Sequence, residues 1–210
     1  MIIPPGGLEG DLVVPPGSPG IVVFAHGSGS SRHSPRNQHV ADMLQQGGFG
    51  TLLLDLLTPE EGATDEQDTH LRFNIELQAT RLIEAVDWLS GNPATARLRI
   101  GCFGASTGAA AALVAAARRP DNVRAVVSRG GRPDLAGPAL AVVDAPTLLI
   151  VGGRDHAVID LNRRALDQLR CDKDLRIVPG ATHLFEEPGA LDKVAELAGE
   201  WFATWLHAGR

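Results

Sequence analysis

The feature that most constrains the fold is a regular alternation of short, unbroken apolar runs with longer segments of helical pattern. Six runs of strand length occur at residues 21–24, 51–54, 98–103, 125–127, 147–151 and 175–178. Helical candidates lie near residues 35–47, 70–90, 107–119, 158–170 and 190–207. Parallel strands that are covered on both faces are apolar throughout rather than alternating. The order therefore predicts an α/β protein with a mostly parallel sheet flanked by helices.

The first twenty residues differ from this pattern. Turn signals at Pro4-Pro5-Gly6-Gly7 and Pro15-Pro16-Gly17 bracket an extended stretch at residues 8–14. This stretch suits an antiparallel strand at the edge of the sheet. The 210 residues contain no repeat and no long linker, and two domains would each have only a small core. We therefore expect a single domain over residues 1–210.

Composition and charge narrow the class of partner. The chain is 44% hydrophobic and 21% charged, which is typical of a globular protein with a sizeable core. The formal net charge is -6, and basic residues cluster only in short pairs such as Arg118-Arg119. This balance argues against nucleic acid and against an anionic membrane surface. We expect a small-molecule partner and a monomer or a small homo-oligomer.

The sequence also bears on location. No basic residue precedes Arg32 and no apolar stretch of signal-peptide type follows Met1. The longest apolar stretch, at residues 109–117, is far shorter than the roughly 20 residues that cross a bilayer. A cytoplasmic protein is the expectation.

The strongest local signal is the pentapeptide Gly104-Ala105-Ser106-Thr107-Gly108. It follows an apolar run directly and precedes an alanine-rich helical segment, so it matches the nucleophile elbow of α/β-hydrolases. In such a turn the flanking positions are small because side chains there would clash. The pattern predicts Ser106 as a nucleophile at the carboxyl end of the sheet.

A serine hydroxyl needs a base, and the base needs an acid that holds its tautomer. In α/β-hydrolases the chain order is Ser, acid, His. Asp155 follows the apolar run that ends at Val151, and His183 follows the next run, which ends at Val178. We therefore predict a triad of Ser106, Asp155 and His183.

Other residues could compete for these roles. His156 adjoins the predicted acid, and an exposed loop position is the preferred interpretation of it. Asp134, Asp144 and Asp160 each lie in a turn or at a helix start, where capping explains a carboxylate.

Acyl transfer also needs N–H donors for the oxyanion that develops on the substrate. Thr107, which follows the nucleophile, supplies one. The second is expected from the small residues after the first long strand, His26-Gly27-Ser28-Gly29. We predict Ser28, with Gly27 as the alternative.

Two arginines are candidates for substrate selection. Arg129 follows the run at residues 125–127, and Arg72 lies in the segment after Asp55. Placed near the rim of the site, either could select a carboxylate-bearing substrate, although a solvated or salt-bridged arginine is the commoner case.

Metal and cofactor sites are not expected. His26, His33 and His39 have no accompanying cysteine or carboxylate cluster, and their spacing fits no common ligand pattern. Gly27-Ser28-Gly29 lacks a third glycine at position 32, which makes a nucleotide-binding loop a poor alternative.

The chain resembles the dienelactone hydrolase family of α/β-hydrolases over nearly its whole length. The likeness lies in residues 24–30 with Pro35-Arg36-Asn37, in residues 104–108, and in residues 153–155 with residues 180–185. It implies an eight-stranded sheet of the α/β-hydrolase fold without a large cap domain. It also implies a cofactor-free acyl-enzyme mechanism acting on a short-chain ester or lactone.

One difference from the resembled family bears on the substrate. The founding members of the family use an elbow cysteine and a glutamate from the early loop, whereas this chain has Ser106 and no Glu between His26 and Val40. The serine favours a carboxylesterase. A non-catalytic ligand-binding protein of the same fold, a thioesterase and an acyltransferase remain alternatives.

Overall fold

Eight strands form one sheet in the order β1-β2-β4-β3-β5-β6-β7-β8. The computed structural model describes residues 1–207, apart from the side chain of Asp68. The strands are β1 (Ile2–Ile3), β2 (Leu8–Val13), β3 (Gly20–Ala25), β4 (Gly50–Leu54), β5 (Arg99–Ala105), β6 (Val123–Arg129), β7 (Thr147–Gly152) and β8 (Lys173–Val178).

Strand directions confirm a mostly parallel sheet. β3 to β8 pair in parallel, whereas β2 runs antiparallel to β4. The predicted strand at residues 8–14 is thus antiparallel, but it is not the edge strand. The edge strand on this side of the sheet is β1, which pairs with β2 through Ile2 and Glu9. Two residues are too short a run to be recognised from the sequence.

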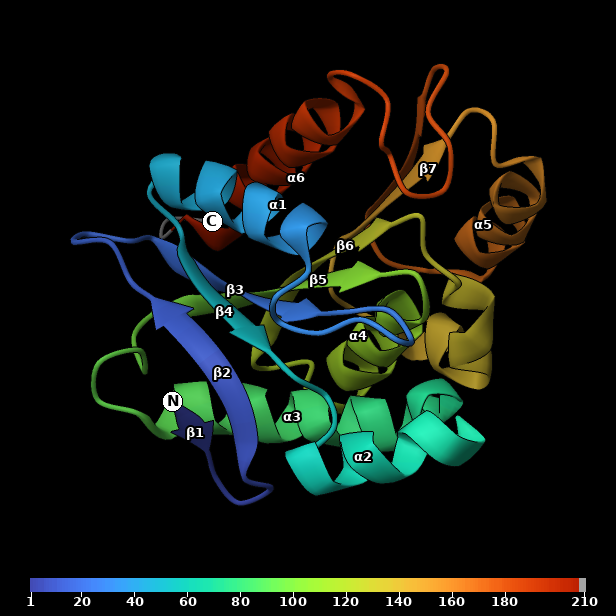
Figure 1. Ribbon diagram of the computed structural model, residues 1–210. Coiled ribbons are helices and arrows are strands. Elements are labelled where there is room, and N and C mark those ends of the chain that lie inside the picture. The colour runs from blue at the N-terminus through green and yellow to red at the C-terminus, as the bar shows by residue number, and fades with distance from the viewer. Residues whose placement is uncertain (208–210) are drawn as a thin grey trace.

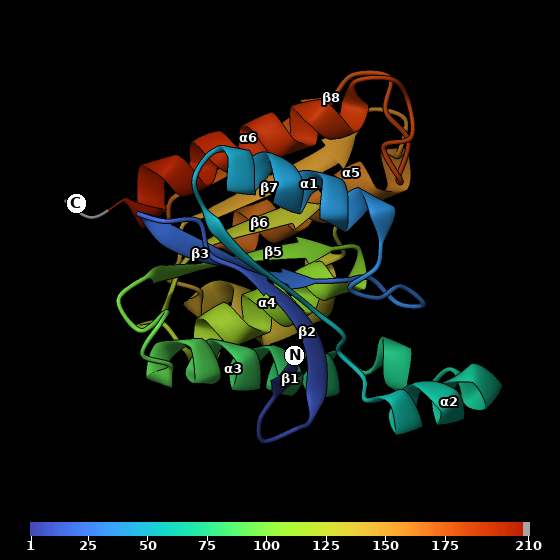
Figure 2. The same cartoon turned by 60° about the vertical axis from the view of Figure 1, so that its left-hand side comes forward.

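Helices cover both faces of the sheet (Figures 1 and 2). α1 (Pro35–Gln46) and α6 (Ala190–Leu206) lie together on one face, and α3 (Ile75–Gly91) and α4 (Thr107–Arg118) lie on the other. α5 (His156–Gln168) packs beside β7 and β8. Alternate residues of β3 point to the two layers: Ile21 and Val23 toward α3 and α4, Val22 and Phe24 toward α1 and α6. These two layers are the hydrophobic core.

The sequence pattern missed two elements near the carboxyl edge of the sheet. α2 (Pro59–Asp68) is polar throughout and is stabilised at its start by a capping box between Thr58 and Glu61. The short helical segment η2 (Pro133–Val142) is broken by non-helical backbone at Gly137. The helix expected from residue 70 is divided into η1 (Leu71–Phe73) and α3. α2 and η1 are small insertions, and no large cap covers the sheet.

No helix within residues 1–207 is long and apolar enough to cross a membrane. The cytoplasmic location expected from the sequence stays a prediction.

Candidate active site

Ser106 lies in a strained turn between β5 and α4. Its φ is 51° and its ψ is -120°, a conformation that residues with a side chain rarely adopt. The two glycines that flank the turn have no room for a side chain. A Cβ at Gly104 would lie 2.4 Å from Ala109 Cα, and one at Gly108 would lie 2.2 Å from the Ala25 carbonyl oxygen. The turn therefore has the geometry that the sequence predicts for a nucleophile elbow.

Backbone hydrogen bonds hold the elbow against the neighbouring strand. The Ser106 N–H donates to the Arg129 carbonyl at 3.2 Å, and the Arg132 N–H donates to the Ser106 carbonyl at 3.0 Å. Ser106 is partly exposed, so its hydroxyl lies at the accessible carboxyl edge of the sheet.

Asp155 and His183 are joined by a short hydrogen bond of 2.6 Å between Asp155 Oδ2 and His183 Nδ1. A carboxylate accepts, so Nδ1 carries the proton and Nε2 is left with a lone pair. Asp155 is the less exposed partner, with 16% side-chain exposure against 38% for His183. The pair has the arrangement of an oriented general base.

The loop that carries His183 is held from both sides. Glu187 Oε2 accepts from the Thr182 N–H at 3.0 Å, and this hydrogen bond lowers the pKa of Glu187. Gly130 packs against the histidine, because a Cβ there would lie 3.6 Å from His183 Cε1. Gly130 directly follows Arg129, whose carbonyl accepts from the Ser106 N–H. Ser106 and His183 therefore lie at the same edge of the sheet. No hydrogen bond joins these two described side chains.

The competing residues have other roles. His156 is the exposed first residue of α5, and Asp144 is also exposed. Asp134 pairs with Arg132 at 2.8 Å, and Asp160 pairs with Arg163 at 3.3 Å.

The predicted oxyanion donors lie on both sides of Ser106. Thr107 is the first residue of α4, where an N–H has no acceptor within its helix. The Ser28 N–H donates to Thr107 Oγ1 at 2.8 Å, which brings the loop after β3 against the elbow. Gly27 is closer to the nucleophile, since a Cβ there would lie 3.0 Å from Ser106 Cβ. The choice between Ser28 and Gly27 stays a prediction.

His26 has a role that the sequence reasoning missed. Its Nε2 accepts from the Leu56 N–H at 3.1 Å, so Nδ1 carries the proton and donates to the Gly27 carbonyl at 2.9 Å. Burial lowers the pKa of His26, which favours this neutral form. The imidazole thus links the loop after β3 to the loop after β4. A histidine directly after a buried strand was the available signal.

Arg32 anchors the far end of the same loop. Its N–H donates to Asp55 Oδ1 at 2.6 Å, and its guanidinium pairs with Asp55 and with Glu9. The segment between β3 and α1 is therefore fixed at both ends, and its N–H groups are held in place.

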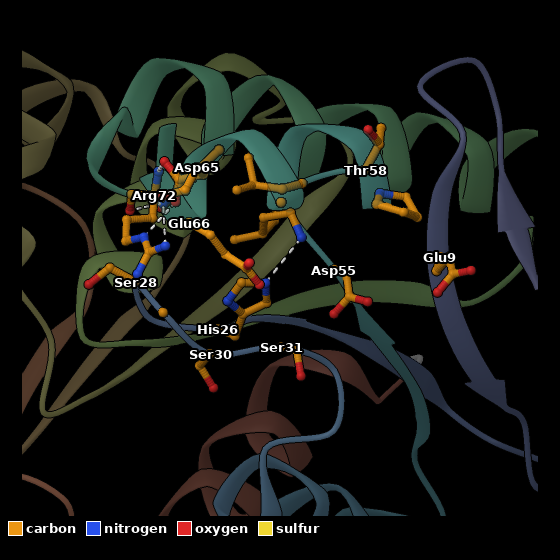
Figure 3. Close-up of a pocket in the computed structure, with 16 residues that line it drawn as sticks. Glu9, His26, Ser28, Ser30, Ser31, Asp55, Thr58, Asp65, Glu66 and Arg72 are labelled. Carbon is orange, nitrogen blue, oxygen red and sulfur yellow. Dashed lines mark hydrogen bonds and ion pairs between the residues drawn. The ribbon is translucent and has the colours of Figure 1, made fainter. Parts of the chain in front are cut away.

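A cavity of about 470 Å³ opens between this loop and α2 (Figure 3). His26, Ser28, Gly29, Leu56 and Arg72 are among the residues that line it. It belongs to the size range of small-molecule sites. Ser28 connects the cavity to the elbow through its bond to Thr107.

Arg72 lines this cavity in a fixed orientation. Its Nε donates to Asp65 Oδ2 at 2.5 Å and its Nη2 to the Asp65 carbonyl at 2.9 Å. Its Nη1 faces the loop, since a Cβ at Gly29 would lie 3.6 Å from it. Figure 3 shows the guanidinium beside Ser28. Arg72 is thus placed to contact a ligand in the cavity.

The sequence analysis suggested that Arg129 could lie near the rim of the site, but the structure buries its side chain. It is only 7% exposed, and its Nη2 donates to Asn37 Oδ1 of α1 at 3.3 Å. The reason is strand alternation: Arg129 shares the face of Val127, which packs in the layer of α1 and α6.

Among the residues that the structure describes, no group of three or more His, Cys, Asp or Glu side chains could hold a metal ion.

Comparison with protein families gives a match over almost the whole chain. Residues 8–207 match the model of the dienelactone hydrolase family. A crystal structure of dienelactone hydrolase from Anabaena variabilis is 63% identical, with a TM-score of 0.94 over 95% of this chain and 93% of that one. Est1E from Butyrivibrio proteoclasticus has a TM-score of 0.80 over 97% of both chains at 17% identity, which shows a shared fold.

Two curated relatives carry a different kind of name. Proteins of two Mycobacterium tuberculosis strains, each named "Putative phosphoribosyl transferase", are 61% identical over 199 residues. The match covers 95% of this chain but 44% of each relative, so this chain spans less than half of their length. The family match, the related structures and the strained serine elbow agree: the chain belongs to the dienelactone hydrolase family and has the α/β-hydrolase fold.

Proposed function

We propose that this chain is a serine hydrolase that cleaves small carboxylic esters or lactones through an acyl-enzyme on Ser106. The observation that carries the proposal is the strained elbow at Ser106 on the same sheet edge as the 2.6 Å hydrogen bond between Asp155 and His183. Family membership supports hydrolase activity. The residues supply every group that the reaction needs.

The first half of the reaction forms the acyl-enzyme. Ser106 Oγ attacks the ester carbonyl while His183 Nε2 takes its proton, and Asp155 stabilises the imidazolium. Apo enzymes often hold such groups slightly apart until substrate binds, so rotation of the two side chains completes the Ser106 to His183 contact. The tetrahedral intermediate then expels the alcohol, which takes the proton from His183.

The second half releases the acid. His183 removes a proton from water, the water oxygen attacks the acyl carbon, and Ser106 regains its proton as it leaves. In both halves the oxyanion accepts from the Thr107 N–H and from the N–H of Gly27 or of Ser28, the latter once it has left Thr107 Oγ1. The short links through His26 and Arg32 support this role, because donors that are already oriented need no reorganisation during the reaction.

The cavity beside Ser28 holds the remainder of the substrate in this proposal. Its volume of about 470 Å³ suits a small ester rather than a long-chain lipid. Arg72 would offer Nη1 to a polar group of the ligand, since Asp65 occupies its Nε and Nη2.

The name of the mycobacterial relatives belongs to proteins more than twice as long as the matched segment. We assign the hydrolase chemistry to this chain, because it carries the elbow and the Asp155 to His183 pair.

The test measures hydrolysis of p-nitrophenyl acetate and p-nitrophenyl palmitate, together with an acetyl thioester, by the wild type and by Ser106→Ala. Ser18→Ala is the matched control, since its hydroxyl donates to the Pro15 carbonyl in a turn outside the site. Circular dichroism verifies that all three proteins are folded.

Activity on the acetate ester that is lost only in Ser106→Ala supports the proposal. Preference for the thioester would move the assignment to a thioesterase. Equal activity in Ser106→Ala, or none in the wild type, would contradict it and favour a ligand-binding protein or another nucleophile.

A further inference from the structure

A buried arginine beside the elbow lacks the partners that such a group needs. Arg129, only 7% exposed, has one side-chain hydrogen bond, from Nη2 to Asn37 Oδ1 at 3.3 Å. Its Nε and Nη1 are shielded from solvent and have no hydrogen-bond partner. No ion pair joins it to any carboxylate that the structure describes. A buried guanidinium without a counter-ion is costly and needs an explanation.

A second positive charge makes the imbalance larger. Burial, together with the positive charge of Arg36, lowers the pKa of Arg129 to about 10, so Arg129 is still charged at neutral pH. Arg36 Nε is also buried and without a partner. Arg36 Nη1 lies 3.6 Å from Oε1 of Glu186, whose side chain is 64% exposed. Among the described residues, the only carboxylate that pairs with either guanidinium group is thus that of Glu186, which is exposed and contacts Arg36 alone.

The first turn of α1 adds to the same positive region. Ser34 caps the helix, and Arg36 and Asn37 lie in its first turn. The N-terminus of this 12-residue helix carries partial positive charge. Pro35 has no N–H and the Asn37 N–H donates to Ser34 Oγ at 3.4 Å, which leaves the Arg36 N–H in the first turn. Such an end attracts anions, and the Arg129 side chain contacts it through the hydrogen bond from Nη2 to Asn37.

This positive region adjoins the proposed reaction centre. The Arg129 carbonyl accepts from the Ser106 N–H at 3.2 Å, and α1 begins directly after the loop that carries Ser28. Glu186, which pairs with Arg36, lies three residues after His183. The positive region therefore lies beside both Ser106 and the loop of His183.

We propose that Arg129, Arg36 and the first turn of α1 form a subsite for a phosphate-type dianion carried by the ester substrate. A dianion matches two guanidinium charges, whereas a carboxylate would balance one. In this proposal Arg36, whose side chain is one third exposed, binds the dianion first, and its movement opens the shielded Nε and Nη1 of Arg129. The substrate assignment rests on the proposed hydrolase function, but the binding of the dianion does not.

The first experiment measures binding without turnover, in Ser106→Ala. Thermal unfolding is followed with inorganic phosphate, acetate and chloride at equal ionic strength. Phosphate is expected to raise the melting temperature of Ser106→Ala and not that of its double variant with Arg129→Met. Arg163→Met, which removes an arginine that is 64% exposed, is the control and should keep the effect. Equal effects of the three anions, or an effect that survives Arg129→Met, would overturn the subsite.

A second pair of variants guards against misfolding. Arg129→Met removes an unpaired buried charge, so without phosphate it should melt at the same or a higher temperature. Glu186→Gln changes only an exposed side chain that competes for Arg36, and it should tighten phosphate binding. Weaker binding in Glu186→Gln would contradict the assigned role of Arg36.

The source of the dianion is tested by kinetics with three p-nitrophenyl esters of similar length: butanoate, hydrogen succinate and 3-phosphonopropanoate. The KM of the phosphonate should be about tenfold or more below that of butanoate in the wild type, and this ratio should approach one in Arg36→Met. Free phosphate should inhibit phosphonate hydrolysis competitively. Equal KM values, or phosphate binding that leaves phosphonate hydrolysis unchanged, would contradict a substrate subsite. A succinate KM as low as that of the phosphonate would contradict the dianion.

If none of the esters is hydrolysed but phosphate still binds through Arg129, the hydrolase proposal fails and the anion site stands. If esters are hydrolysed and phosphate does not bind, the anion site fails and the hydrolase stands.

Discussion

Asp155 Oδ2 lies 2.6 Å from His183 Nδ1, although 28 residues separate the two along the chain. The sheet explains this contact: Asp155 follows β7, His183 follows β8, and parallel neighbours end at the same edge. The proton on Nδ1 leaves Nε2 free to act as a base, so the pair fixes the tautomer that the proposed chemistry requires.

The first prediction concerns this tautomer. Asp155→Asn can donate its amide hydrogen to Nδ1, which would place the imidazole proton on Nε2. We expect kcat on a short ester to fall by about 10³- to 10⁴-fold with the fold intact. Asp160→Asn, which alters an exposed ion pair, should leave kcat unchanged. A loss below about tenfold would contradict the role of Asp155.

The second prediction concerns the space around the elbow. Gly108→Ala places a Cβ 2.2 Å from the Ala25 carbonyl oxygen, so the strand and the helix must move apart. We expect the free energy of unfolding to fall by about 3 kcal/mol or more, measured by urea denaturation.

Gly62→Ala is the matched control for that substitution. Gly62 lies within α2, and a Cβ there meets no atom within 4 Å. Its replacement should stabilise the protein by about 0.5–1 kcal/mol. Equal effects at the two positions would show that the close contact at Gly108 is unimportant.

The third prediction concerns the contact between Ser28 and Thr107. Thr107→Val removes the acceptor of the Ser28 N–H while keeping the shape of the side chain. Loss of this partly buried hydrogen bond, worth about 1–2 kcal/mol, should lower kcat by about tenfold and leave KM almost unchanged. Thr107→Ser retains the hydroxyl and should retain most of kcat. If both variants behave alike, the hydroxyl does not position the loop.

The fourth prediction concerns pH. Burial lowers the pKa of His26 below its usual 6.5, so the unfolded chain binds a proton more readily than the folded one. The stability that His26 contributes is therefore fully present above about pH 6.5 and is lost as the pH falls toward the folded pKa. Between the two pKa values, each drop of one pH unit should lower the free energy of unfolding by about 1.4 kcal/mol.

Urea denaturation between pH 7.5 and pH 5 checks this dependence. His26→Asn should be less stable at pH 7.5 because the link to Leu56 is lost, and its stability should decline less with acid. The exposed His156→Gln should follow the wild type. A decline in His26→Asn as steep as in the wild type would assign the effect to another group.

Much of the fold could be predicted because its signals are local. The runs at residues 21–24 and 147–151 are buried on both faces, so they are apolar throughout and easily recognised. α2 was missed because its polar sequence has no apolar period, and its start depends on the capping contact between Thr58 and Glu61. The apolar period of a helix marks the face that it buries, and α2 buries little of its surface.

The site was predictable to a similar degree. Ser106, Asp155 and His183 follow from a turn motif and from chain order, and the structure joins the last two directly. The position of Arg129 could not be foreseen, since a strand-end arginine is usually solvated and its burial depends on α6 packing over β6 and on its contact with Asn37 of α1. Expectations about partners, oligomeric state and location stay predictions.

The most direct test of the account is covalent labelling with a fluorophosphonate, followed by intact mass and peptide mapping. The proposed mechanism predicts one adduct per chain on Ser106, no adduct in Ser106→Ala, and much slower labelling in His183→Ala. Ester hydrolysis that persists while Ser106 remains unlabelled, or a label on another residue that abolishes activity, would contradict it.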